Sequence, residues 1–148
     1  MGRSIYIYQQ SPDGTYTETQ VVNAVFIVKL LSCSDGMIIA SLTRKKIKIF
    51  AGENYETVQT IDNSERVGKI ASNEDFEMFA AGRADGSVHI YQRNGSQFQL
   101  SQQLNVGFTA TGLVLNSERL IASGLSTDIH IYEFNGSGYW LRQVIHTN

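Results

Sequence analysis

A short strand-like motif recurs four times along the 148-residue chain at a nearly constant interval. In each copy two aliphatic residues alternate with other residues and an aromatic ring closes the motif: Ile5–Tyr8, Ile47–Phe50, Val88–Tyr91 and Ile129–Tyr132. Successive copies begin 41 or 42 residues apart, and a period of about 40 to 45 residues is typical of four-stranded β-propeller blades. The spacing predicts a row of similar blades instead of one continuous sheet.

Further features recur in phase with this motif. A strand of small and apolar residues precedes the second, third and fourth copies, at 38–41, 78–82 and 120–124, and one more apolar stretch lies upstream of each, at 28–31, 68–71 and 112–115. A glycine-containing turn follows every copy, and we expect Asn94-Gly95 and Asn135-Gly136 to form type I′ turns. The next strand opens with an aromatic residue and carries glutamine four positions later: Tyr16 and Gln20, Tyr55 and Gln59, Phe98 and Gln102, Tyr139 and Gln143. Every full repeat therefore holds four strands.

The predicted fold is all-β, with residues 1–148 forming a single propeller domain. It comprises a partial blade at 1–23 and full antiparallel blades at 24–62, 63–105 and 106–148, about three and a half in total. An open arc of this kind exposes an apolar blade face at each end. We expect further blades of a larger propeller, other protein subunits or additional copies of the chain to cover these ends.

The segments "IIASLTRKKIKIF", "MFAAGRADGSVHIY" and "LIASGLSTDIHIY" resemble the second and third strands of WD40 repeats, although the Gly-His and Trp-Asp pairs that name the family are absent. The resemblance implies a non-catalytic scaffold that binds other proteins. It also implies that turns between second and third strands share one ligand-binding face with the connections between blades. Arg44, Lys45, Lys46 and Arg83 would then be candidates for binding an acidic peptide or a phosphate group. The alternative is that they form solvated turns protecting a sheet edge.

The residue types and their spacing do not indicate an enzyme or a metal site. His89 and His130 occupy equivalent positions, but Tyr6 and Lys48 fill that position elsewhere, which predicts a variable, exposed site and no metal. Cys33 sits at a predicted turn without an identifiable base. We therefore expect no catalytic residues and no cofactor.

The composition limits the classes of partner that the chain is expected to bind. A net charge of −2 favours neither nucleic acid nor a membrane surface. The absence of a signal-peptide pattern and of a long apolar run predicts a cytoplasmic protein. The alternative function is a propeller that binds a glycan or small ligand, with the recurring aromatic and glutamine residues, such as Tyr139 and Gln102, forming pockets between blades.

Overall fold

The computed structural model describes residues 3–24, 27–32, 36–42, 45–125 and 128–147, and every regular element within them is a β-strand. The first sheet contains β1 (Arg3–Gln10) and β2 (Tyr16–Ala24). The second contains β3 (Ile27–Ser32), β4 (Ile38–Leu42), β5 (Lys46–Ala51) and β6 (Glu56–Asp62). The third contains β7 (Val67–Ser72), β8 (Met78–Arg83), β9 (Ser87–Asn94) and β10 (Gln97–Asn105). The fourth contains β11 (Gly112–Leu115), β12 (Arg119–Ser123), β13 (Ile129–Phe134) and β14 (Tyr139–Ile145).

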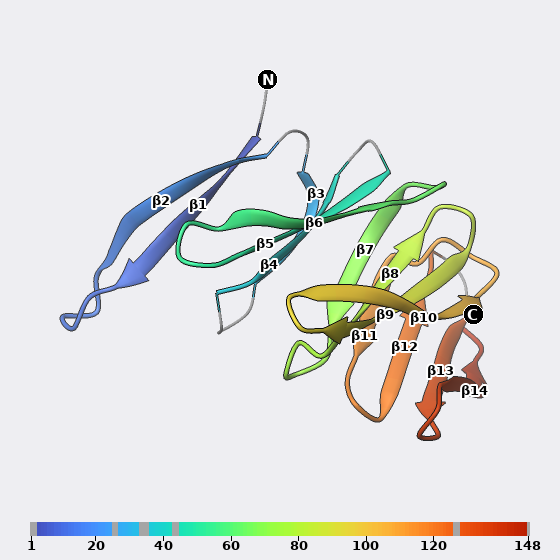
Figure 1. The fold of residues 1–148 in the computed structure, drawn as a ribbon. Coiled ribbons are helices and arrows are strands. Elements are labelled where there is room, and N and C mark those ends of the chain that lie inside the picture. Colours follow the sequence, from blue (N-terminus) through green and yellow to red (C-terminus); the bar gives the residue numbers. More distant parts are fainter. Residues whose placement is uncertain (1–2, 25–26, 33–35, 43–44, 126–127, 148) are drawn as a thin grey trace.

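Each four-stranded sheet is an antiparallel meander in which strands adjacent in the chain are adjacent in space. The recurring motif forms the third strand of each full blade, namely β5, β9 and β13, and the corresponding strand β1 of the first sheet. Figure 1 shows the four sheets following one another in an open arc, with the first and last sheets apart. The predicted all-β architecture of propeller blades is confirmed.

Neighbouring sheets approach each other most closely through their first strands, since β3 lies beside β7, and β7 beside β11. Three apolar clusters fill the three spaces between sheets. Small residues permit the close approach: Ala80 and Ala81 of β8 are fully buried, one on each side of the third sheet. Each middle blade therefore has both faces covered, and hydrophobic burial between blades holds the arc together.

The turns between third and fourth strands differ from expectation. A type I′ turn needs positive φ at both central residues, and only the glycines adopt it, with φ of +67° at Gly95 and +95° at Gly136. The type I′ prediction is therefore wrong. The Asn135 side chain instead accepts hydrogen bonds from the backbone N–H groups of Ser137 and Gly138, each at 3.1 Å, so asparagine stabilises this turn through its side chain.

Candidate functional site

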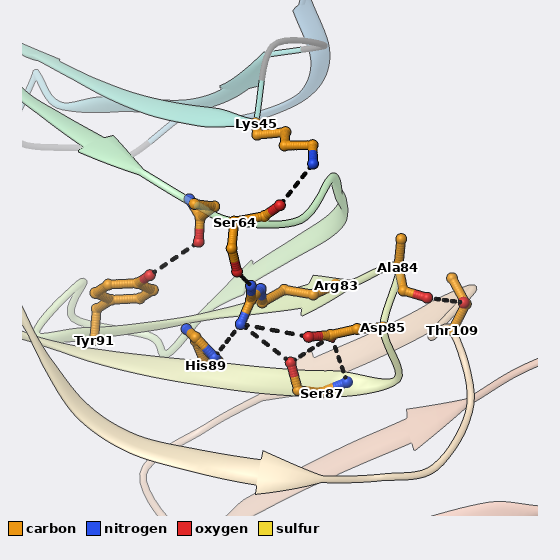
Figure 2. Close-up of polar contacts among 10 residues, drawn as sticks. Lys45, Ser64, Arg83, Ala84, Asp85, Ser87, His89, Tyr91 and Thr109 are labelled. Carbon is orange, nitrogen blue, oxygen red and sulfur yellow. Dashed lines mark hydrogen bonds and ion pairs between the residues drawn. The ribbon is translucent and has the colours of Figure 1, made fainter.

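Two of the predicted basic residues meet at the connection between the second and third blades. Lys45 lies in the turn between β4 and β5, with φ of +61°, and its Nζ donates to the carbonyl oxygen of Ser64 at 2.7 Å. Arg83 ends β8 and donates from Nη2 to the hydroxyl of the same Ser64. Figure 2 shows Ser64 between the two cations. Turns of neighbouring blades and the connection between blades thus share one face, as the resemblance implied.

The other two predicted residues contribute less to this site. Lys46 pairs with Asp62, with Nζ and Oδ1 3.1 Å apart and both side chains substantially exposed. Such an exposed pair adds little stability but neutralises the lysine locally. Arg44 lies outside the described residues. Among the described members of the predicted basic set, Lys45 is therefore the exposed cation that contacts a neutral carbonyl oxygen, whereas Lys46 contacts a carboxylate.

Arg83 is not in a solvated turn: it is only 5% exposed. Its Nη1 lies 2.5 Å from His89 Nε2 and 3.7 Å from the Asp85 carboxylate, while its buried Nε has no hydrogen-bond partner among the described residues. The expectation of a solvated turn fails here because the connection carrying Ser64 folds over the guanidinium. Hydrogen bonds to Ser64 and His89 and the long ion pair with Asp85 therefore compensate only part of the hydration that the buried guanidinium has lost, since Nε stays without a partner among the described residues.

His89 is also buried, so the expected exposed position is wrong for this repeat. Burial and then the positive charge of Arg83 lower the pKa of His89, which opposes protonation. The neutral ring can therefore accept a hydrogen bond from Arg83 at Nε2 (Figure 2). The Ser87 hydroxyl, followed by smaller effects that include Arg83, lowers the pKa of Asp85 and keeps it charged.

A pocket of about 600 Å³ opens between the second and third sheets beside this cluster. Its polar wall includes Asn63, Ser64, Arg83 and His89, and Phe98 lies on its apolar side. The arginine supplies hydrogen-bond donors of the kind that bind carboxylate or phosphate. Binding of an acidic group to the basic set remains a prediction.

The recurring glutamines link the outer strands of successive blades. The Gln59 side chain accepts a hydrogen bond from the backbone N–H of Phe98 and donates one to its carbonyl oxygen, both at 2.7 Å. Gln102 repeats both contacts with Tyr139, at 2.7 and 2.6 Å. We call this two-bond contact the glutamine clasp. Neighbouring sheets approach most closely at their first strands, so their outer strands are farther apart. The long glutamine side chain spans this distance and connects the outer strands.

The first blade forms half of this contact. Gln20 donates to the carbonyl oxygen of Asn54. The neighbouring Tyr55 has φ of +49° and lies in a turn where its N–H is already bonded to the carbonyl of Gly52 at 3.2 Å. Tyr55 thus lies in the turn before β6, whereas Phe98 and Tyr139 lie within their strands, and among the described residues Gln20 makes one backbone hydrogen bond, to Asn54.

A β-bulge places the aromatic residue and the glutamine on opposite faces of the blade. Residues four apart in a regular strand share a face. In the third sheet Leu100 pairs with Tyr91, whereas Gln102 pairs with Ile90, so the register shifts by one residue between them. The other three outer strands show the same shift. The aromatic residue consequently faces the preceding blade and the glutamine reaches the following one.

These contacts account for the pattern that motivated the sugar-binding alternative. Tyr139 is buried in the cluster between the third and fourth sheets, and its hydroxyl donates to the carbonyl oxygen of Asn116 at 2.7 Å. Burial, and to a lesser extent Glu74, raises the pKa of Tyr139 to about 12. The amide of Gln102 is occupied by its clasp. Both side chains thus have internal structural roles, which gives the sugar-binding alternative no support.

Among the described residues, the last sheet is covered on one face only. Leu120, Ala122 and Tyr132 pack against the third sheet, and alternate residues point the opposite way. We call the opposite side the C-terminal face; its apolar members, each exposed or half-buried, are Val114, Ile121, Ile129, Ile131, Trp140 and Ile145.

In the described ranges the first sheet is also covered on one face only. Ile5 and Val22 pack against the second sheet. The residues that alternate with them on the opposite side are exposed, and we call that side the N-terminal face: Tyr6, Tyr8, Tyr16 and Val21. Both ends of the arc therefore present apolar side chains to solvent.

Within the described ranges, no group of three or more His, Cys, Asp or Glu side chains is placed to hold a metal ion. The described part of the chain also contains no helix long and apolar enough to cross a membrane. Cys33 lies outside the described residues.

Comparison with known proteins identifies the fold. No protein-family model and no curated protein sequence matches the chain. The solved structures that are similar include the WD40 repeats of RRP9, with a TM-score of 0.70 and 14% identity over 82% of this chain, and U3-55K, with a TM-score of 0.70 and 14% identity over 83%. The chain thus has the fold of WD40-type β-propeller blades.

The aligned region spans 39% of the RRP9 structure and 40% of the U3-55K structure. This chain therefore corresponds to about two fifths of each of those propellers. The four sheets that the structure describes in this chain do not close into a ring (Figure 1).

Proposed function

We propose that this chain is a non-catalytic protein-interaction module that binds its partners through the two ends of its arc. The position of the exposed large hydrophobic side chains supports this proposal. Among the described residues, all of them except Leu100 lie on the first sheet or on the last sheet and its turns: Tyr6, Tyr8, Tyr16, Val21, Val114, Leu125, Phe134, Trp140, Leu141 and Ile145. Apolar side chains gathered on a protein surface mark sites where another protein binds.

The WD40-type fold supports the same function. Its blades are rigid because burial on both faces fixes each middle sheet, and rigid surfaces lose little entropy when a partner binds. The basic set of Lys45, Lys46 and Arg83, with Arg44, would provide a second contact for an acidic segment of a partner.

Three variants test the proposal. Val114→Asp places a charge on the C-terminal face, Tyr8→Asp places one on the N-terminal face, and Gln99→Asp is the control because Gln99 is exposed in a middle blade and does not line the pocket beside Arg83. Each tagged chain is cross-linked in cells and purified, and the recovered proteins are quantified. We expect specific proteins to be recovered with the unmodified chain and Gln99→Asp and lost with an end-face variant. An identical set of proteins for all four chains would refute binding through the end faces.

A further inference from the structure

The two ends of the arc carry the complementary halves of one interface. We infer that the C-terminal face of one copy binds the N-terminal face of a second copy, head to tail, with Gln143 forming a glutamine clasp on Tyr16. This inference rests on the proposed function, because it names the partner of the same end faces.

The C-terminal face repeats a surface that a following blade covers elsewhere in the chain. Ile49, Ile90 and Ile131 are repeat-equivalent residues of β5, β9 and β13. The first two are at most 1% exposed because the next sheet packs on them. Ile131 retains partial exposure because no sheet follows it in the described chain. The same type of residue at the same position therefore favours a propeller blade as the missing neighbour.

The N-terminal face carries the other half of the same contact. Phe50, Tyr91 and Tyr132 are 3% to 5% exposed because each packs against the preceding sheet, whereas the equivalent Tyr8 is 55% exposed. Tyr16 is 67% exposed. An aromatic surface that elsewhere covers aliphatic side chains is thus open at the beginning of the arc.

The clasp specifies how the two faces would align. Gln143 pairs with Ile131 after the same bulge that directs Gln102 toward the next blade. Tyr16 pairs with Gln10 on the preceding strand, in the register in which Phe98 pairs with Arg93 and Tyr139 with Phe134.

The backbone of Tyr16 therefore faces the free edge of β2 as those of Phe98 and Tyr139 face the edges of β10 and β14. Its N–H and carbonyl groups can receive a glutamine amide there. Gln143 is exposed in β14, at the opposite end of the chain.

A second copy carries the face that is complementary to either end of the first. The first and last sheets of one arc lie apart (Figure 1), so the two faces do not meet within the described residues of one chain. Two copies can join through unlike faces, which is a heterologous contact that leaves one face free at each end. Such contacts extend into a ring when the rotation closes and into a chain when it does not.

Sedimentation velocity on the full chain and two blocked variants tests this arrangement. Tyr8→Asp blocks the N-terminal face, and the double variant Val114→Asp/Ile145→Asp blocks the C-terminal face. All three substituted side chains are exposed, so the blades should still fold, which circular dichroism verifies. We expect the unmodified chain to exceed its 16.5 kDa monomer mass with rising concentration. Each blocked variant alone should remain monomeric, and their mixture should form a 1:1 dimer.

A second pair of variants tests the role of the glutamine clasp in the interface. Gln143→Ala should raise the dissociation constant roughly tenfold or more, since it removes two hydrogen bonds from the interface. Gln103→Ala, an exposed glutamine of β10, is the matched control and should leave the constant unchanged. Equal effects of the two substitutions would overturn the role of Gln143.

The remaining outcomes distinguish this inference from the proposed function. Dimers formed by the Tyr8→Asp variant alone would indicate like-with-like pairing and overturn the head-to-tail arrangement. A single monomeric species up to about 100 µM would overturn self-association. If the chain is monomeric and the end-face variants still lose other proteins in cells, the proposed function stands with a different partner. If the chain is monomeric and the variants lose no proteins, both the proposed function and the head-to-tail inference fail.

Discussion

Replacing Gln102 by alanine should destabilise the contact between the third and fourth blades without disturbing either sheet. The side chain forms two hydrogen bonds, at 2.6 and 2.7 Å, with the backbone of Tyr139. A hydrogen bond within a protein contributes about 0.5 to 1.5 kcal/mol net, so the loss of both corresponds to about 1 to 3 kcal/mol. The surroundings are partly buried, and water can partly replace the lost amide, which favours the lower half of this range.

Urea unfolding of the two proteins, followed by circular dichroism, measures the difference in free energy of unfolding. Gln103→Ala is the control, because this neighbouring glutamine has the same strand propensity but is exposed. We expect the control to change stability by less than about 0.5 kcal/mol. Gln59→Ala should match Gln102→Ala, since it removes the same pair of bonds. If Gln102→Ala costs no more than Gln103→Ala, the clasp does not stabilise the arc.

Three further predictions concern the core, the buried histidine and a turn. Phe79→Ala should cost about 3 to 5 kcal/mol in urea unfolding, because the ring is fully buried between two other rings; a loss below 1.5 kcal/mol would contradict this packing. The lowered pKa of His89 means that the unfolded chain binds its proton more readily, so stability should decrease as the pH falls through the ordinary value of 6.5. Thermal unfolding of His89→Gln should show a flatter dependence from pH 7 to 5, and an unchanged slope would exclude His89 as its source. Gly86→Ala should destabilise more than Gly95→Ala, because both glycines have positive φ but a Cβ at Gly86 would lie 3.1 Å from a backbone nitrogen; equal melting temperatures would refute the close approach.

The architecture was largely predictable from sequence because it depends on local rules that repeat. Ile90 and Tyr91 occupy adjacent positions of β9 and face opposite blades, as strand alternation requires. The same alternation at a 41- or 42-residue interval predicted four strands for each full blade and apolar faces at the ends. Local turn chemistry acts in the same way at Asp85, whose Oδ1 accepts a hydrogen bond from the Ser87 N–H at 3.0 Å.

The candidate site was less predictable because its contacts join residues that are far apart in sequence. The local sequence predicts that Arg83 and His89 are exposed turn and strand residues. In the structure both are buried, because the connection carrying Ser64 folds over them. Their burial then lowers the pKa of His89, an effect that depends on desolvation and on a charge from another strand. No local pattern carries that information.

The glutamine clasp shows most clearly which features depend on the sequence alone and which depend on the tertiary structure. The sequence by itself determined that an aromatic residue and a glutamine recur four positions apart in every outer strand, as with Tyr139 and Gln143. Only the tertiary structure decided that a bulge sends them to opposite faces and that Gln102 binds the next blade. The reason is physical: alternation depends on neighbouring residues, whereas a bulge and a contact between blades depend on how two sheets pack.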